Sequence, residues 1–348
     1  MLHTKFMKRY DNLFDKIVSI DNLKEAYRKA KKGKSWQDKV RKVECDLDNK
    51  MFELQEMLVN GTYKTSSYKT KEIHEPKKRT IYILPFYPDR IVHHAIMNVL
   101  ENILDKRFYV DSYACRKGKG QHKGSFRTMD FVRKNKYVLQ CDVSKFYMNV
   151  DHKKLKLILC RMFKDRKLLN LLFEIIDSID GGKNVPIGNY LSQWFGNLYL
   201  NELDNYVKHT LRVKSYIRYC DDFCIYSNDK SYLSWVAENV KNYIDNVLYL
   251  RLSKIKKYPT SQGVDFLGYR HFPKYILLRK STKKRVVKRI KGLVGAIKHG
   301  DCTPEQAVSK IASAKGWLKH AQTHNLQISM NIEQVYDEVI KLGKRPQV

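Results

Sequence analysis

The sequence contains no long apolar segment, no paired-cysteine motif and few acidic residues. No run approaches the roughly 18 consecutive apolar residues of a membrane-spanning helix, and the first residues, MLHTKFMKRY, show no apolar signal segment. The 7 cysteines form no CxxC pair, which argues against a disulfide scaffold or a structural zinc site. No fixed-period repeat or low-complexity tract is present. These absences predict a cytoplasmic protein with no membrane association.

Positive charge is what the chain has in excess. Across 348 residues, 67 Lys and Arg oppose 36 Asp and Glu, which gives a formal net charge of +31. Such an excess causes self-repulsion that a polyanionic partner relieves. Hydrophobic residues make up 43% of the chain and aromatic residues 12%, which is enough to bury a core. We therefore expect a folded protein that binds nucleic acid.

Helix and strand patterns alternate without the regular strand–helix–strand order of a parallel sheet. Helical patterns cover residues 22–32, 37–60, 89–107, 153–177 (two helices), 190–203, 231–246 and the chain from 281 onward. Strand patterns cover residues 68–74, 79–84, 137–143, 215–226, 264–269 and 275–278. Because Asp221 and Asp222 interrupt the segment 215–226, it is interpreted as a hairpin whose turn carries both acids. The order predicts an α+β fold with an antiparallel sheet and a separate helical tail.

Three carboxylates lie at strand ends in otherwise apolar surroundings. Asp142 comes at the end of the strand VLQCDV, and Asp221 and Asp222 lie within YIRYCDDFCIYS. Adjacent carboxylates in an apolar hairpin repel each other and lose hydration. A divalent cation offsets that cost, and two Mg²⁺ ions can clamp the attacking and leaving oxygens of a phosphoryl transfer. The alternative is an exposed turn with two acids of no functional importance, which the apolar flanks and the second strand-end Asp disfavour.

Several motifs, in their order along the chain, resemble those of reverse transcriptases. Tyr219-Cys-Asp-Asp222 resembles the Y-x-D-D motif of that family, and Asp142-Val-Ser-Lys-Phe-Tyr147 resembles its first carboxylate motif. Similarity extends to the fingers blocks RTIYILP and DRIVHHA, to the next block SYACRKGKG, and to the primer-gripping hairpin VDFLGY. The resemblance covers about residues 70 to 275. It implies a right-hand polymerase fold of bacterial or phage origin, with N-terminal helices and fingers at 1–138, a palm at 139–275 that includes a fingers insertion around 152–185, and a helical thumb at 276–348.

One departure from the common bacterial pattern points to a subfamily. Most bacterial reverse transcriptases carry Q-G-x-x-x-S-P where this chain has IGNYLSQ at residues 187–193. That block, and AKGWLKH at residues 314–320, are similar to the reverse transcriptases of diversity-generating retroelements. The resemblance implies an enzyme that copies a template-repeat RNA, misincorporates opposite adenines and binds a pentameric accessory variability protein.

The resemblance also assigns roles at the predicted catalytic centre. Asp142 and Asp221 are expected to ligate two Mg²⁺ ions, which Mn²⁺ could replace, with the carbonyl oxygen of Val143 as a further ligand. Asp222 completes the motif with a less direct metal contact. Tyr147 occupies the position of the family's steric gate, where a bulky ring disfavours the 2′-OH of a ribonucleotide. The alternative for Tyr147 is a core aromatic residue.

Further residues are expected to contact the incoming dNTP. Lys77 and Arg79 suit the triphosphate, although a solvated hairpin tip would also be rich in Lys. Gly188 is expected to let the backbone approach the nucleotide, and Gln193 closes the same motif. Ile187 stands where a hydrogen-bonding Gln usually faces the base pair. Because a site without such a group rejects near-isosteres poorly, we hypothesise that Ile187 contributes to low fidelity; the alternative is a buried aliphatic residue at a helix start.

Two basic segments are expected to contact the template RNA and the RNA/cDNA heteroduplex. The first is a flexible glycine-rich loop over 116–124, followed by a helix; its cations are Arg116, Lys117, Lys119 and Lys123. The second is a helix over 279–291 that neutralises phosphates without reading bases; its expected contacts are Lys283, Lys284, Arg285, Lys288 and Arg289. Gly268 belongs to the primer-gripping block. For both segments a solvated basic face is the alternative. His93 and His94 are interpreted as packing or capping residues.

Other functions compete with an RNA-directed DNA polymerase of a retroelement. A defence-associated bacterial reverse transcriptase would use another non-coding RNA, and the IGNYLSQ block argues against it. A viral-type RNA polymerase is disfavoured by Tyr147, and a catalytically silent RNA-binding scaffold by the three intact acids. The stretch after residue 275 is too short for an RNase H domain and has no Cys/His cluster for a zinc endonuclease.

Overall fold

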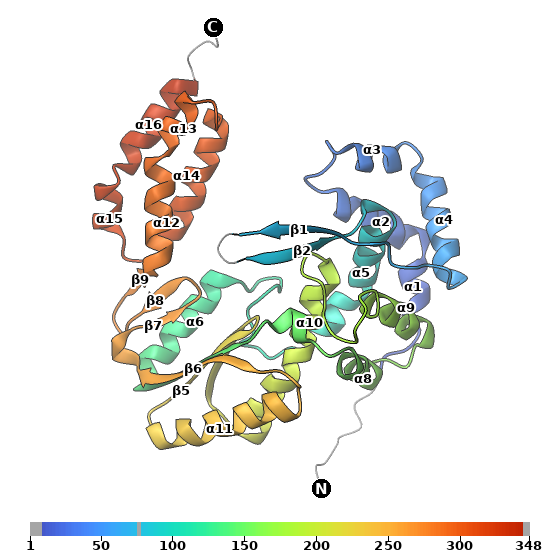
Figure 1. Ribbon diagram of the computed structural model, residues 1–348, viewed down its shortest axis with the longest axis horizontal. Coiled ribbons are helices and arrows are strands. Elements are labelled where there is room, and N and C mark those ends of the chain that lie inside the picture. Colours follow the sequence, from blue (N-terminus) through green and yellow to red (C-terminus); the bar gives the residue numbers. More distant parts are fainter. Residues whose placement is uncertain (1–8, 75–77, 344–348) are drawn as a thin grey trace.

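The computed structural model describes residues 9–74 and 78–343. Helices and small antiparallel sheets are mixed along the chain, which confirms the predicted α+β class. Figure 1 shows the N-terminal helices at one end, a central sheet, and a helical bundle at the other end. None of the helices in these two ranges has the length and apolar character needed to cross a bilayer.

Four helices open the described chain: α1 (Phe14–Val18), α2 (Ile20–Lys31), α3 (Asp38–Glu44) and α4 (Leu47–Val59). Helix α2 confirms the prediction for 22–32. The single helix predicted over 37–60 is wrong, because Asp46 leaves the helical region with φ −135° and ψ 43°. The break separates the buried pair Val40 and Val43 of α3 from the buried face of α4.

A hairpin and two long helices follow. Strands β1 (Lys69–Ile73) and β2 (Arg79–Ile83) pair antiparallel, as predicted, with Lys69 opposite Ile83. The chain then passes through the π-helical turn η1 (Phe86–Arg90) into α5 (Ile91–Asp105) and on to α6 (Gln121–Lys134). Helix α5 confirms the pattern over 89–107, and its apolar face, including Ile91, Ala95 and Ile96, is fully buried.

The central sheet has the strand order β4–β5–β3–β6 and is antiparallel throughout. Its members are β3 (Tyr137–Val143), β4 (Ser215–Tyr219), β5 (Asp222–Ser227) and β6 (Leu252–Pro259). The sequence patterns missed β6, whose residues LSKIKKYP contain three lysines. An edge strand tolerates such charges because one of its long sides has no neighbouring strand, and β6 lies at the edge of this sheet.

Helices fill the space on one side of the sheet. Leu139, Cys141 and Val143 of β3 belong to the main core, which also takes in side chains of α10 (Tyr190–Asn205) and α11 (Lys230–Asn246). Three helices connect β3 to α10: α7 (Phe146–Asn149), α8 (His152–Met162) and α9 (Arg166–Ile176), and a second π-helical turn, η2 (Tyr206–Thr210), follows α10. Since β3 alternates, Gln140 and Asp142 point to the opposite side.

A second small sheet joins the body to the C-terminal bundle. The segment VDFLGY forms the hairpin that the resemblance predicted, with strands β7 (Val264–Phe266) and β8 (Tyr269–His271). The single strand that the pattern predicted over 264–269 is wrong, because Leu267 and Gly268 both have positive φ and turn the chain. The short helix η3 (Thr260–Gln262) precedes β7. Strand β9 (Ile276–Leu278) pairs with β8. The chain continues as α12 (Lys280–Lys291), α13 (Leu293–Lys298), α14 (Pro304–Lys319), α15 (His324–Ser329) and α16 (Ile332–Gly343). These helices share a separate core, which confirms the predicted helical tail.

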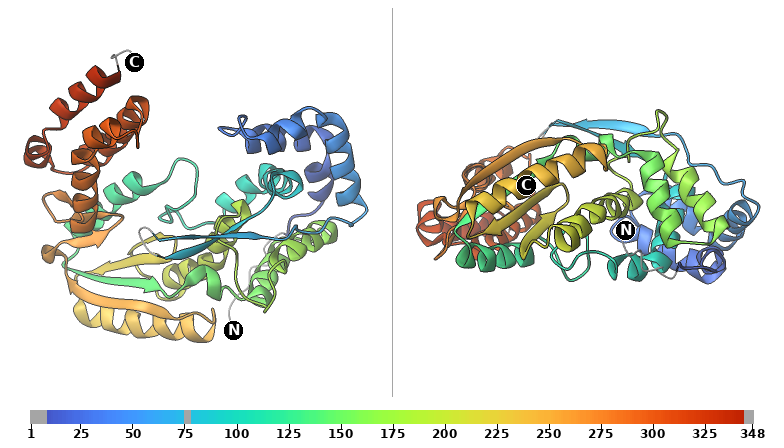
Figure 2. Two further views of the ribbon diagram at one scale, coloured as in Figure 1. Left: turned by 45° about the horizontal axis from the view of Figure 1, so that its top comes forward. Right: turned by 90° about the horizontal axis from the view of Figure 1, so that it is seen from below.

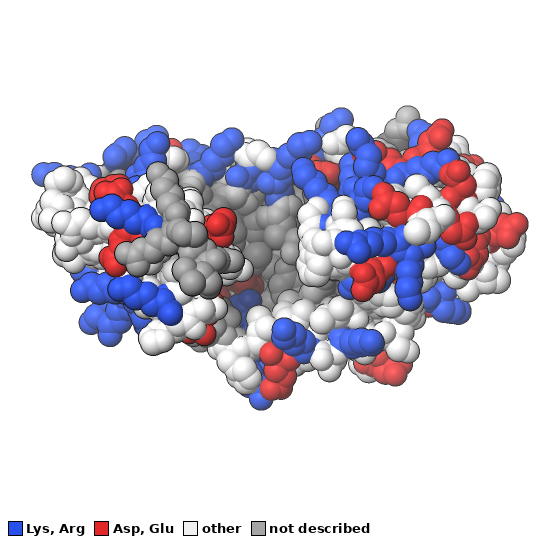
Figure 3. Space-filling model, turned by 90° about the horizontal axis from the view of Figure 1, so that it is seen from above, with Lys and Arg blue, Asp and Glu red and all other residues white. Residues whose placement is uncertain are grey.

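The two helical ends rise on either side of the sheet. Figure 2 shows the C-terminal bundle and the N-terminal helices as two arms, with β3 to β6 between them and α11 beneath the sheet. In the space-filling view of Figure 3 the face between the two lobes is hollowed, and Lys and Arg side chains gather along its upper edge. The face of β3 opposite the main core is covered in part as well, because Val138 packs with Phe131 of α6 and Val264 of β7.

Candidate active site

The three predicted carboxylates meet at one end of the central sheet. Strands β4 and β5 form the predicted hairpin, in which Cys220 and Asp221 make the turn and Asp222 begins β5. Cys220 adopts φ +53°, which closes this tight turn. Asp142 lies directly opposite Asp222 in the β3–β5 register, and the backbone N–H of Val143 donates to the carbonyl oxygen of Asp221 at 3.2 Å. The sheet thus brings together acids that are some 80 residues apart in the sequence.

Asp222 has the most perturbed environment of the three. Burial raises the pKa of its carboxyl group to about 7; the positive charge of Lys254 opposes this rise, and the charges of Asp142 and Asp221 add to it. Its Oδ1 atom is buried without a hydrogen-bond partner among the described residues. A buried carboxylate oxygen without a partner is costly. It is therefore a place where a bound cation would stabilise the site.

Asp142 is oriented by the neighbouring edge strand. The hydroxyl of Ser253 on β6 donates a hydrogen bond to Oδ2 of Asp142 and also contacts its carbonyl oxygen. The β3–β6 register shifts between Asp142 and Val143, so the ladder is irregular at the acid. Such bulges re-aim a side chain. The contribution of the Val143 carbonyl oxygen to a metal site remains a prediction.

The acids fit the expected Mg²⁺ sites, although they do not form a closed ligand shell. In the described ranges no group of three or more His, Cys, Asp or Glu side chains is already arranged around a metal position. Mg²⁺ usually keeps water and substrate phosphates among its ligands and takes only one or two carboxylates. When bound, the ions would neutralise charge on the phosphate oxygens. The unpartnered oxygen of Asp222 and the adjacent Asp142 are the observations that support this fit.

A buried ion pair supports the catalytic turn, and sequence reasoning missed it. Arg218 on β4 and Asp204 on α10 are both fully buried, with Nε of Arg218 donating to Oδ1 of Asp204 at 2.7 Å. Nη1 of Arg218 also donates to the carbonyl oxygen of Cys220 at 3.0 Å. Arg218 therefore ties the turn that carries Asp221 to the core. An arginine in the middle of the apolar strand YIRYC was the available signal.

Tyr147 lies beside this turn. It belongs to α7, four residues after Val143, and burial raises the pKa of its phenol, with the thiols of Cys220 and Cys115 and the charge of Asp221 as further causes. Its ring packs against Gly196 of α10, where an added Cβ would lie 3.0 Å from Cε1 of Tyr147. The position next to the acids is compatible with the expected steric gate, which remains a prediction.

The expected dNTP contacts have different surroundings. Arg79 is exposed at the start of β2, and Lys77 lies outside the described residues. The N–H of Tyr82 on β2 donates to the carbonyl oxygen of half-buried Ile187 at 2.8 Å. Gly188 has φ +121°, and an added Cβ would lie 2.3 Å from the carbonyl oxygen of Tyr82. Gly188 is therefore needed because the backbone passes close to β2. The motif resemblance predicted that it passes close to a nucleotide.

Gln193 is exposed in the first turn of α10. It lines a small cavity together with Gly188. Its contact with a nucleotide remains a prediction.

The predicted flexible basic loop is shorter and more ordered than expected. Helix α6 begins at Gln121, so Lys123 and Gly124 are helical. The side chain of Arg116 is only 5% exposed and its Nε donates to Oδ1 of Asp105 at 2.6 Å. Its other nitrogens donate to backbone carbonyl oxygens, including that of Tyr109. These contacts favour a structural role for Arg116, and correct the prediction that it contacts nucleic acid.

The other cations of this segment differ in their availability. Lys117 and Lys123 are exposed. Nζ of Lys119 donates to the carbonyl oxygen of Val110 at 2.7 Å and lies 4.9 Å from the ring centroid of Tyr113. Lys117 and Lys123 therefore remain the free candidates for a phosphate contact.

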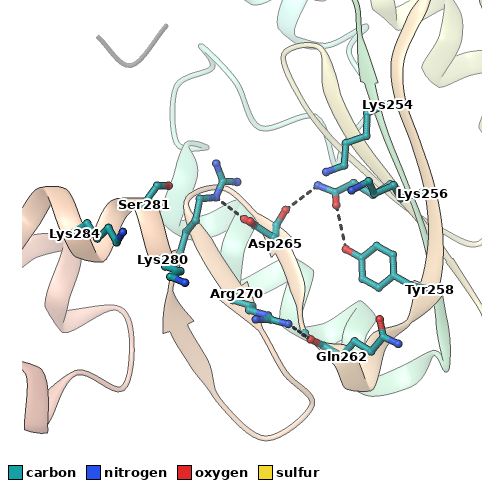
Figure 4. Close-up of a pocket in the computed structure, with 12 residues that line it drawn as sticks. Lys254, Lys256, Tyr258, Gln262, Asp265, Arg270, Lys280, Ser281 and Lys284 are labelled. Atoms are coloured by element: carbon teal, nitrogen blue, oxygen red, sulfur yellow. Dashed lines mark hydrogen bonds and ion pairs between the residues drawn. The ribbon is translucent and has the colours of Figure 1, made fainter.

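A basic groove lies beside the acids, between the central sheet and the start of the bundle (Figure 4). Its volume is about 670 Å³ and its one carboxylate, Asp265, is paired with Arg279 and accepts at its backbone carbonyl oxygen from Gln140 at 2.7 Å. Its cations are Lys254, Lys256, Arg270, Arg279, Lys280 and Lys284. Lys254 lies opposite Asp142 in the β3–β6 register. The groove therefore continues from the acidic centre toward α12.

The predicted basic helix forms the far wall of this region. Its five predicted contacts are all exposed on α12: Lys283, Lys284, Arg285, Lys288 and Arg289. Val286 and Ile290 are buried on the inner face of the helix. Gly268 does not face the groove: an added Cβ would lie 2.8 Å from Trp317 of α14. Gly268 is therefore small because Trp317 packs against it. The motif resemblance predicted that this glycine contacts the primer. The groove cations on β6 were missed with that strand.

Comparison with known proteins agrees with this site. The family model described as reverse transcriptase (RNA-dependent DNA polymerase) matches residues 48–271. Protein YkfC of Escherichia coli K12 is 26% identical over 248 aligned residues, which cover 58% of this chain and 63% of that protein. The group II intron-encoded protein LtrA of Lactococcus lactis subsp. cremoris is 22% identical over 296 residues, covering 64% of this chain and 49% of that protein. The chain thus spans between about half and two thirds of the length of these relatives.

Proposed function

The chain belongs to the reverse transcriptase family, and on that premise we propose that it is an RNA-directed DNA polymerase. Its α+β architecture agrees with the right-hand polymerase fold of that family. The proposal depends above all on one observation: Asp142 lies opposite Asp222, next to Asp221, at one end of the central sheet. Template RNA, the RNA/cDNA heteroduplex and dNTPs are the substrates that the acids and the basic groove would serve. We propose the same division into fingers, palm and thumb that the motifs predict.

The residues around the acids suit nucleotidyl transfer. Ser253 holds Asp142, and Arg218 holds the turn that carries Asp221, so the carboxylates are oriented before substrate binds. Preorganised charge of this kind costs no rearrangement during the reaction. The six groove cations would contact the phosphate backbone of the duplex and keep its 3′ end over the acids. Tyr147, beside the turn, would limit the site to deoxynucleotides.

Primer extension on an RNA template tests this function. We expect Mg²⁺-dependent dNTP incorporation by the wild-type chain and a loss of at least about 100-fold in Asp221→Asn, since the charge that binds the ion is removed. Asp38→Asn is a matched control, because Asp38 is 88% exposed on α3, far along the chain from the acids. No incorporation by the wild type, or unchanged incorporation by Asp221→Asn, would overturn the proposal.

We further propose that the enzyme is error-prone at template adenines, as in a diversity-generating retroelement. The support is the IGNYLSQ block and the position of Ile187, whose carbonyl oxygen is bonded to β2 and whose side chain offers no hydrogen bond to a base pair. A pentameric accessory protein would then help to hold the template RNA. Ile187→Gln should lower misincorporation opposite adenine more than opposite other bases. Equal error spectra in both proteins would refute the role of Ile187.

A defence-associated reverse transcriptase is the second candidate, because the catalytic acids are common to both. The two differ in their genetic surroundings. A neighbouring variable gene with paired repeats would support the retroelement, and a conserved non-coding RNA without such repeats would support the defence function.

A further inference from the structure

Two cysteine side chains meet beside the catalytic turn. Cys220 lies in the turn that carries Asp221, and Cys115 lies in the turn that precedes α6. Both are free thiols, and the thiol of Cys220 donates a hydrogen bond to the sulfur of Cys115. The fold therefore places in contact two cysteines that are far apart in the sequence.

Backbone pairing sets this juxtaposition. Ser112 and Arg218 form a parallel bridge, in which the N–H of Tyr113 donates to the carbonyl oxygen of Arg218 at 3.0 Å. Beyond the bridge both segments turn through the left-handed region, with φ +54° at Cys115 and φ +53° at Cys220. Neither cysteine belongs to a helix or strand. The small backbone shift that a disulfide needs would therefore break no regular hydrogen-bond ladder.

A buried amide fastens both turns to the same helix. Nδ2 of Asn197 on α10 donates to the carbonyl oxygen of Ala114 at 2.9 Å, and its Oδ1 accepts from Nη1 of Arg218 at 3.2 Å. The same guanidinium nitrogen holds the carbonyl oxygen of Cys220. Asn197 is only 3% exposed. The two thiols are thus held together by core contacts on both sides.

The two sulfurs differ in their access to solvent. Cys115 is exposed and Cys220 is half-buried, whereas Cys141 and Cys224 on the neighbouring strands are buried. The hydrogen bond from Cys220 lowers the pKa of the Cys115 thiol. Cysteines that sense oxidants combine access, thiolate character and a neighbouring thiol that can close a disulfide. Cys115 has all three properties.

We propose that Cys115 and Cys220 form a reversible disulfide when the protein meets a peroxide, and that this bond switches off nucleotidyl transfer. The effect on activity rests on the proposed polymerase function, whereas the disulfide itself does not. A dithiol would restore the active form by thiol–disulfide exchange.

The oxidation runs in two steps. As a thiolate, Cys115 attacks an oxygen of hydrogen peroxide, the O–O bond breaks, and a sulfenic acid forms on Cys115. The hydroxide that leaves takes the proton of the Cys220 thiol. The Cys220 sulfur then attacks the Cys115 sulfur, the S–O bond breaks, and the departing hydroxide recovers the proton that Cys115 first released. Both sulfurs are oxidised, and the peroxide is reduced to water.

The position of the bond explains the expected loss of activity. The thiols of Cys220 and Cys115 are among the causes that raise the pKa of the Tyr147 phenol, so the pair lies beside this residue. A disulfide would draw the turn toward Cys115, against the hydrogen bond by which Arg218 holds the Cys220 carbonyl oxygen. Because a displacement of about 1 Å can cost about 100-fold in rate, we expect primer extension to fall at least about tenfold.

Peptide mapping and primer extension on the same samples test the proposal. The full chain would be treated with hydrogen peroxide, quenched with catalase, alkylated and digested with trypsin. We expect a cross-link between the peptides FYVDSYACR and YCDDFCIYSNDK, with fragment ions that assign it to Cys220 and exclude Cys224. Extension should fall with the yield of this cross-link and return after dithiothreitol.

Each variant is compared with its own reduced form, so none needs wild-type basal activity. Cys115→Ser and Cys115→Ala should lose both the cross-link and the response to peroxide. In Cys220→Ser, dimedone should label Cys115, because the sulfenic acid has no thiol to react with. The matched control is Cys45→Ser, which removes another exposed cysteine and should respond as the wild type does. Thermal melts of the reduced proteins would show that each variant folds.

Three results would overturn the switch: no cross-link in the wild type, full extension by the cross-linked protein, or an equal loss of extension in the Cys115 variants. Failure of the proposed function looks different. A reduced wild type that extends no primer, but still forms the cross-link, would overturn the polymerase proposal and leave the oxidation site in place.

Discussion

The buried pair of Arg218 and Asp204 offers a sharp test of how the fold positions the catalytic turn. Both side chains are 0% exposed, and Asp204 also accepts from the hydroxyl of Tyr216 at 2.6 Å. In Asp204→Asn the guanidinium keeps its charge but loses its counter-ion in a buried site. Breaking such a pair from one side costs about 3–5 kcal/mol. We expect urea unfolding to show a loss of that size.

A double substitution separates stability from positioning. Arg218→Met with Asp204→Leu removes both charges and fills the space with apolar groups, which is often neutral or stabilising. Tyr216 loses its acceptor, which costs about 1–3 kcal/mol, so we expect recovery of roughly half of the loss in Asp204→Asn. Primer extension should stay at least about tenfold below wild type, because the Cys220 carbonyl oxygen is no longer held and a displacement of about 1 Å can cost about 100-fold.

The control for this experiment is an exposed ion pair. Lys241 and Asp245 on α11 are 3.0 Å apart, with side chains that are 56% and 31% exposed, so Asp245→Asn should cost less than about 1 kcal/mol. A decrease of less than about 1 kcal/mol in the free energy of unfolding of Asp204→Asn would contradict a buried, charged pair at this position. Full primer extension by the double variant would refute the role of Arg218 in holding the turn.

Three further outcomes follow from contacts near the site. Burial lowers the pKa of His271 to about 4. Since the unfolded chain, with a pKa of about 6.5, binds the proton first, His271 should lower the stability by up to about 3 kcal/mol between about pH 6.5 and 4. Urea unfolding of His271→Gln should therefore show a shallower fall in stability than the wild type, while His93 and His94, whose pKa values burial also lowers, keep their contributions. Gly188→Ala should weaken the contact with β2, because its Cβ would lie 2.3 Å from the Tyr82 carbonyl oxygen; an unchanged melting temperature would contradict this. Ser253→Ala should lower primer extension about tenfold without a stability loss above about 1 kcal/mol, since Asp142 loses a donor; unchanged extension would mean that Ser253 does not orient the acid.

The acidic centre could be predicted because its signals are local. Asp221 and Asp222 interrupt an apolar strand pattern, and a short interruption of that kind forces a turn. Asp142 lies at the end of another apolar strand pattern, and the motif resemblance predicted that it acts together with Asp221 and Asp222. The segment Leu252–Pro259 was missed for the opposite reason. Lys256 and Lys257 are adjacent and interrupt the alternation of apolar and polar residues. An exposed edge strand of this kind is hard to distinguish from a basic loop by pattern alone.

Residues whose partners depend on the three-dimensional packing could not be assigned in advance. Arg116 has the sequence surroundings of a phosphate-binding loop, but Asp105 and three backbone carbonyl oxygens use its guanidinium. Gly268 has the surroundings of a primer contact, but Trp317 lies where its side chain would be. In both cases the sequence predicted the kind of contact, a charged hydrogen bond for Arg116 and a close approach for Gly268. Which partner makes that contact depends on tertiary packing. Composition therefore predicts a nucleic-acid partner better than it predicts which cation meets it.

The basic residues of the groove come from both the sheet and the bundle. Lys254 and Lys256 come from the sheet, and Lys280 and Lys284 come from the first helix of the bundle, yet all four line one groove. Their mutual repulsion opposes any closer approach of the bundle to the sheet while the groove is empty. A nucleic-acid backbone in the groove would turn this net repulsion between the sheet and the bundle into a net attraction, because each phosphate would lie between cations of the two parts. Binding and closure would then be one coupled process, and both would weaken together as salt screens the charges.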